Sequence, residues 1–218
     1  WPENVFVFTD GLESVTIQGL DCRIYGGAFQ SMDCPSLLEG FQAQGEEKYC
    51  VAVLHGDPIQ RNSPYNPITN AQVRDSALDY LALGHVHKAG SFRAGNTLCS
   101  WPGCPMGRGF DELEEKGVYL VTMEKQAQAE FIPLDTPRFY DLETPAQQLD
   151  SLLPPVGNDD FYRITLVGES EPLDLKDLQS RYSRFPNLLL RDQTTPPVDI
   201  WKALGEDSFE GTYFELLH

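Results

Sequence analysis

The sequence lacks several features that would place it in common classes of protein. Its 218 residues contain no run of about eighteen apolar residues, so we expect no transmembrane helix. The opening stretch, WPENVFVFTDG, has neither a basic region nor a small-residue cleavage site, so it resembles neither a signal nor a transit peptide. The five cysteines are odd in number and include no C-x-x-C pair, which favours reduced thiols in a cytoplasm.

Basic residues are also few. The chain has 16 Lys and Arg against 33 Asp and Glu, and its formal net charge is −17. A surface with this balance repels the phosphates of a nucleic acid instead of displacing their counterions. The charge therefore gives no support to nucleic-acid binding by this chain.

Histidine is scarce too, but three of the four histidines stand just after apolar runs. YCVAVLHGD ends in His55, and YLALGHVHKAG carries His85 and His87. Continuous apolar runs are typical of strands that are buried on both faces. If the two strands are parallel neighbours, all three imidazoles lie at one edge of a sheet, where open α/β sheets bind their ligands.

Neutral imidazoles beside glycines suit a divalent metal such as manganese, zinc or iron. A single histidine in such a place is more often a structural residue than a ligand. Three of them at neighbouring strand ends favour a metal site formed by His55, His85 and His87.

The remaining pattern predicts a mixed α/β protein with two parts. Residues 1–136 read as a sheet domain and residues 137–218 as a small α+β domain, with the boundary within 134–138. The first part is expected to contain a strand over 5–9, a short helix from Pro35 and a hairpin around Gly95.

These motifs resemble a known family. LHGD, DYLALGHVHKAG and WPGCPMGRGFDELEEKGVYLVTM are similar to the second half of the calcineurin-like metallophosphoesterases, and most of all to DNA-repair exonucleases of the SbcD and YhaO type. The resemblance covers about residues 1–134, and the part that follows is similar to the capping domain of that family. It implies a two-sheet α/β sandwich that hydrolyses phosphodiester bonds at a pair of metal ions, usually manganese.

By this resemblance, His55 and His85 would bind one ion and His87 the other. The family also draws ligands from an Asp-x-His, a Gly-Asp-x-x-Asp and a Gly-Asn-His-Asp motif, and none of these occurs in this sequence. We therefore interpret the chain as the second half of such an enzyme, able by itself to hold at most one weakly bound ion and expected to be inactive alone. DNA and an SMC-like ATPase subunit are partners implied by the resemblance only, and an exposed sheet edge would favour a homodimer.

Two other hypotheses stay open. The chain could be a non-catalytic docking module for a partner ATPase or a nucleic acid, with structural histidines. It could instead be a hydrolase that holds one zinc ion through His55, His85 and His87.

Three further features near the histidines have ordinary structural interpretations. Asp57 sits in a Gly-Asp-Pro sequence, which is first of all a turn, and the less favoured alternative is that it orients an imidazole or contacts a metal. Arg108 is expected to be an exposed loop arginine, with contact to a phosphate as the alternative. The acidic stretch DELEEKG, residues 111–117, is expected to be a solvated loop.

Overall fold

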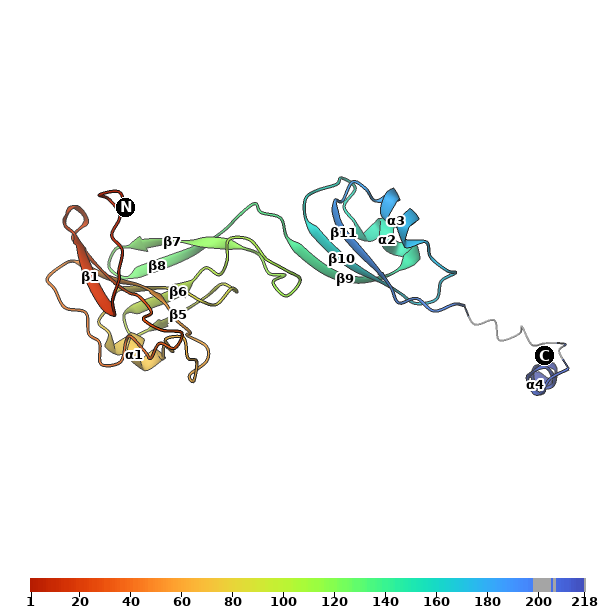
Figure 1. The fold of residues 1–218 in the computed structure, drawn as a ribbon, viewed down its shortest axis with the longest axis horizontal. Coiled ribbons are helices and arrows are strands. Elements are labelled where there is room, and N and C mark those ends of the chain that lie inside the picture. The colour runs from red at the N-terminus through yellow and green to blue at the C-terminus, as the bar shows by residue number, and fades with distance from the viewer. Residues whose placement is uncertain (198–204, 206, 218) are drawn as a thin grey trace. The chain divides into compact units, whose positions relative to one another are not determined.

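The structure is a computed structural model that describes residues 1–197, 205 and 207–217 (Figure 1). By its internal contacts the chain divides into two compact units, Trp1–Arg138 and Phe139–His218. Each unit has a hydrophobic core of its own. The described residues form a mixed α/β structure with three sheets.

The first unit is built on a six-stranded sheet. Its strands are, in spatial order, β1 (Leu12–Ile17), β2 (Cys22–Gly27), β3 (Tyr49–His55), β4 (Tyr80–Gly84), β6 (Thr97–Trp101) and β5 (Gly90–Ala94). The four central strands β2, β3, β4 and β6 are parallel, whereas β1 and β5 pair antiparallel at the two edges. The expected hairpin around Gly95 is formed by β5 and β6.

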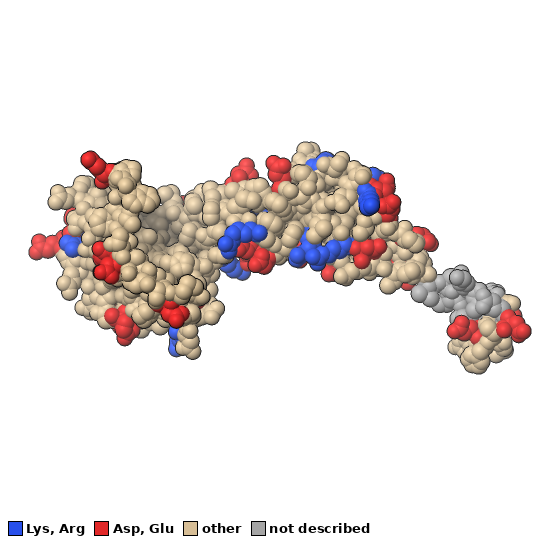
Figure 2. Space-filling model, viewed as in Figure 1, with Lys and Arg blue, Asp and Glu red and all other residues tan. Residues whose placement is uncertain are grey.

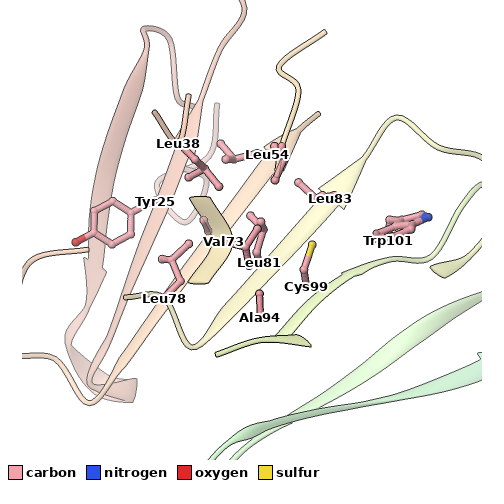
Figure 3. Packing of buried hydrophobic residues seen from close by; sticks show 12 residues of the cluster. Tyr25, Leu38, Leu54, Val73, Leu78, Leu81, Leu83, Ala94, Cys99 and Trp101 are labelled. Carbon is pink, nitrogen blue, oxygen red and sulfur yellow. The ribbon is translucent and has the colours of Figure 1, made fainter. Parts of the chain in front are cut away.

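One face of this sheet packs around helix α1 (Asn70–Asp75). Thr69 and Gln72 form a capping box at the amino end of the helix, each side chain bonded to the backbone N–H of the other. Val73 of α1 is fully buried among side chains of β3, β4 and β6 (Figure 3). The members of this core include Leu54, Leu81, Leu83, Cys99 and Trp101.

The opposite face of the central strands is only partly covered. In β3, Ala52 and Leu54 are buried, but Val53 between them is 51% exposed. The expectation that this apolar strand is buried on both faces is therefore wrong for the described residues. Alternate residues of a strand point to opposite faces, and the second face is left open at Val53 of β3, whereas in β6 the residues of both faces are buried.

Two other segments of the first unit differ from expectation. Residues 5–9 form no strand and are largely exposed, since β1 takes the place beside β2. The helix expected from Pro35 is a single turn, closed by a bond from the Phe41 N–H to the Leu38 carbonyl. Gly40 adopts a φ of +66°, a left-handed conformation that ends a helix.

A separate hairpin completes the first unit. It consists of β7 (Gly117–Met123) and β8 (Ala127–Pro133), paired antiparallel over their full length. Ala127 is buried at its turn end, whereas Val118 and Leu120 are largely exposed.

The second unit holds a three-stranded parallel sheet. Its strands β9 (Phe139–Pro145), β10 (Phe161–Val167) and β11 (Asn187–Asp192) alternate with the helices α2 (Leu149–Leu152) and α3 (Leu175–Arg181). Strand β10 lies in the middle, and its residues Ile164 and Leu166 are fully buried. Helix α4 (Phe209–Leu217) follows near the end of the chain.

Two surface properties bear on function. No helix within the described part of the chain is long and apolar enough to cross a membrane. On the face drawn in Figure 2, acidic side chains are spread over both units, and Lys and Arg side chains form only small groups.

Candidate metal centre

The candidate site lies at the carboxyl ends of β3 and β4. These strands are parallel neighbours, which is the condition for their histidines to lie at one edge, and His55 at the end of β3 is paired with Gly84 at the end of β4. The Gly56 N–H continues the ladder by donating to the Gly84 carbonyl at 3.2 Å. His85 follows at once, so the register alone brings the first two histidines together.

His55 and His85 face one another across the end of the sheet. The distance from His55 Nε2 to His85 Nδ1 is 3.1 Å, and the two rings are nearly perpendicular, at 84°. Burial, followed by the neighbouring His85, lowers the pKa of His55 below its usual value. Both effects favour the neutral form of His55, in which one ring nitrogen carries a lone pair.

Asp57 approaches His85 from its other side. The carboxylate Oδ2 lies 3.5 Å from His85 Nε2, and the side chain is buried. Burial acts to raise the pKa of Asp57, but N–H donors from Gln60 and Ile59 to its Oδ1 outweigh it and hold that pKa below the usual range. Asp57 therefore forms the expected turn and also presents a charge to His85.

The backbone of His85 is in an unusual conformation. Its φ is +114°, in a region that residues with a side chain rarely adopt. Such strain costs roughly 1–3 kcal/mol and persists only where the surroundings enforce it. In this conformation the imidazole of His85 lies against that of His55.

His87 has different neighbours. Its Nδ1 lies 2.8 Å from Oε1 of Glu112, whose side chain is only 9% exposed. Arg108 Nη2 lies 2.7 Å from Nδ1 and 3.1 Å from Nε2 of the same ring. One N–H cannot point along both ring lone pairs, so we interpret the guanidinium as packing against the ring.

The second carboxylate oxygen of Glu112, Oε2, is surrounded by further hydrogen-bond donors. Oε2 accepts from the thiol of Cys104 at 2.9 Å and from the backbone N–H of Arg108 at 3.3 Å, and it lies 3.6 Å from Nζ of the buried Lys116. The bond from Cys104, with that from His87, lowers the pKa of Glu112 to about 2 despite its burial. The expectation that residues 111–117 are a solvated acidic loop is therefore wrong at Glu112 and Lys116.

The chain was compared with known protein families and with individual proteins. No family profile matches the chain. The chain is 30% identical over 131 residues to the uncharacterized metallophosphoesterase YhaO of Bacillus subtilis (strain 168), a match that covers 56% of this chain and 31% of that protein. The similarity supports a metallophosphoesterase family. The chain spans about a third of the length of the curated relative that it matches.

The spacing of His55 Nε2 and His85 Nδ1, which is also that of a hydrogen bond between the rings, is compatible with two ligands of one divalent ion. Two ring nitrogens bound at about 2.1 Å, with an angle of about 90–110° at the metal, lie about 3.0–3.4 Å apart. The observed 3.1 Å falls within this range. Within the described residues, however, no group of three or more His, Cys, Asp or Glu side chains is arranged to hold a metal, so the three-histidine site stays a prediction.

Sequence reasoning missed Glu112. The signal that could have found it is its spacing of four residues from both Arg108 and Lys116, with which it forms ion pairs. That spacing is usually read on helices, and this segment is an irregular loop, so the pattern was not informative by itself.

Proposed function

We propose that this chain supplies the histidine side of the active site of a metal-dependent phosphodiesterase, of the DNA-repair exonuclease type. The observation that carries the proposal is the 3.1 Å approach of His55 and His85 at the ends of adjacent parallel strands. The partial similarity to a metallophosphoesterase supports a hydrolase that acts on phosphoesters with the help of a divalent metal.

In this proposal the histidines have separate tasks. His55 and His85 hold one ion through the two facing nitrogens, and Asp57 orients His85 from behind. His87 presents its Nε2 to a second ion. Manganese is the metal that the resemblance favours, and a pair of such ions acidifies and aims the attacking water.

The donor set in this chain is incomplete for that chemistry. Three neutral imidazoles carry no charge to offset two dications, and a bridging carboxylate is needed to keep the ions close together. We infer that carboxylate ligands come from another part of a longer protein, since the Asp-x-His and Gly-Asp-x-x-Asp motifs are absent from this sequence. The chain alone is then inactive.

The substrate and partners follow the same proposal. We propose DNA as the substrate, the second unit as a capping domain that places it, an SMC-like ATPase subunit as a partner, and the cytoplasm as the location. With a net charge of −17, this chain does not supply the basic surface that DNA needs, so the remainder of the protein or its partner must do so.

The test begins with the codons upstream of Trp1. The proposal expects them to encode the missing carboxylate motifs, and the longer protein to hydrolyse a chromogenic phosphodiester and linear DNA with Mn²⁺. His55→Ala and His85→Ala should each reduce the rate at least about 100-fold, because each removes a ligand of one ion. Glu124→Gln, in the turn between β7 and β8, is the control and should leave the rate unchanged.

Other results would contradict the proposal. A longer protein that lacks those motifs and shows no metal-dependent turnover would rule out the proposed phosphodiesterase. Hydrolysis by the present chain with a single equivalent of zinc, lost in His87→Ala, would instead support the one-zinc hydrolase.

A docking module remains the second candidate. It is favoured by the partly open face of the central strand β3, on which Val53 is half exposed. If His55→Ala and His85→Ala leave both Mn²⁺ binding and turnover of the longer protein intact, the docking role is the better explanation.

A further inference from the structure

The loop that carries Glu112 contacts His87 at two places, the backbone carbonyl and the imidazole ring. The His87 carbonyl accepts from the Cys104 N–H at 3.3 Å and from Lys116 Nζ at 3.4 Å. Gly103 makes this approach possible, because a Cβ there would lie 2.3 Å from the same carbonyl oxygen, and its φ is +80°. The imidazole is held at the same time by Glu112, with Nδ1 at 2.8 Å from Oε1.

The surroundings of Glu112 determine which ring nitrogen carries the proton. A thiol, a backbone N–H and an ammonium surround Oε2, and all three are donors. A carboxylate among such donors is an acceptor only, so the short contact to His87 requires a proton on Nδ1. The neutral ring then has its lone pair on Nε2, on the side away from Glu112. Arg108 Nη2 lies 3.1 Å from Nε2, so this exposed side chain must move aside before a ligand reaches that nitrogen.

We propose that Glu112 is a positioning residue that fixes His87 as the Nδ1–H tautomer and so makes Nε2 a metal-binding atom. In known metal sites, a carboxylate behind a ligating histidine fixes the tautomer and ring orientation in this way. The inference rests on the proposed function for its purpose, but the tautomer itself is a property of the metal-free chain.

The variant Glu112→Gln tests this sharply. The three donors around Oε2 hold the amide oxygen of the new side chain at that position, so its NH₂ group falls next to His87 Nδ1. An NH₂ donor requires an acceptor on Nδ1, which moves the ring proton to Nε2. The substitution keeps the shape of the side chain and inverts the tautomer of His87.

The first measurement is a long-range ¹H–¹⁵N correlation spectrum of the whole ¹⁵N-histidine-labelled chain without metal, at mildly alkaline pH. We expect the Nδ1–H tautomer in the wild type and the Nε2–H tautomer in Glu112→Gln, with the signals of His55 and His85 unchanged. Glu114→Gln is the matched control, because it removes the same charge from the same loop, where Glu114 pairs with Lys88. It should leave His87 as in the wild type.

The second measurement is Mn²⁺ binding by the longer protein that carries the missing carboxylate motifs, followed by the electron paramagnetic resonance signal of the free ion. Glu112→Gln should weaken binding at His87 about 10- to 100-fold, and Glu114→Gln should not. If the tautomer inverts but the wild type binds no Mn²⁺, the positioning role stands and the proposed function fails. Equal binding by wild type and Glu112→Gln would instead deny the tautomer any role in metal binding.

The inference does not depend on the variant folding. An Nε2–H tautomer of His87 in the wild-type spectrum overturns it directly, and so does a wild-type tautomer that persists in a folded Glu112→Gln protein.

Discussion

Single residues at the candidate site combine strain with charge. His85 occupies a backbone conformation that favours glycine, and its ring is held between His55 and Asp57. Strained residues of this kind gather at functional sites, where the rest of the fold enforces them. The backbone conformation of His85 therefore lowers the stability of the folded protein.

The cost can be measured by comparing His85→Gly with His85→Ala. Both remove the imidazole, but only alanine keeps the Cβ that opposes a φ of +114°. We expect the glycine variant to be more stable by about 1–2 kcal/mol in urea unfolding, because the usual preference for alanine is reversed where φ is positive.

The same pair of substitutions at His87, which is not among the positive-φ residues, is the control. There the alanine variant should be the more stable by about 0.5–1 kcal/mol. Equal stability of the two variants at His85 would show that its backbone is not strained.

At the scale of secondary-structure elements, Glu47 links the first strands of the six-stranded sheet. Glu47, just before β3, accepts two bonds from Arg23 of β2, at 2.7 and 3.0 Å, and one from Thr16 of β1, at 2.9 Å. Chiefly through the bonds from Arg23, these contacts lower the pKa of Glu47 to about 2 from an ordinary value of 4.5. The charged form thus helps to fix the edge of the sheet.

A pH dependence of stability follows from this shift. Because the pKa of Glu47 is lower in the folded state, its contribution is complete above about pH 4.5 and is lost as the pH falls towards 2. The stability difference between wild type and Glu47→Gln should therefore shrink over that interval, as measured by urea unfolding at several pH values. Glu46→Gln controls for the lost charge, and a difference that grows in acid would be contrary to this account.

The central strand β3 separates a packed face from an open one. Leu54→Ala should cost about 2–5 kcal/mol, since it leaves a cavity in the core beside α1. Val53→Thr should change the stability of this chain by less than about 1 kcal/mol, because Val53 is half exposed. Urea unfolding of both variants checks the contrast, and a large loss in Val53→Thr would mean that another surface covers this face.

At the scale of the whole molecule, the two units have separate cores. Leu81 belongs to the core of the first unit and Ile164 to that of the second, and both are fully buried. Residues that share no core contact unfold independently unless an interface couples their units.

Calorimetry of the full chain should therefore show two transitions. Leu81→Ala should lower the midpoint temperature of only one transition, and Ile164→Ala that of only the other. Each substitution should reduce the unfolding free energy of its own unit by about 2–5 kcal/mol. A single transition that both substitutions shift would show that the units unfold as one.

Much of the fold could be predicted from local pattern. The apolar runs that end in His55 and Gly84 predict β3 and β4, and the turn at Gly95 predicts the β5–β6 hairpin. Prediction failed where a neighbour decides the outcome. Residues 5–9 have strand-like composition but stay outside the sheet, where β1 is the strand paired with β2, and the turn after Pro35 ends at Gly40, whose φ is positive.

The sequence by itself determined that histidines stand at the ends of two apolar strands, because strand length and alternation are properties of neighbouring residues. Only the tertiary structure decided what surrounds each of them. It sets His55 against His85 and places the buried Glu112 behind His87, across a separation of 25 residues. Such contacts depend on how a loop folds back over the sheet, and the spacing of residues along the chain does not contain that information.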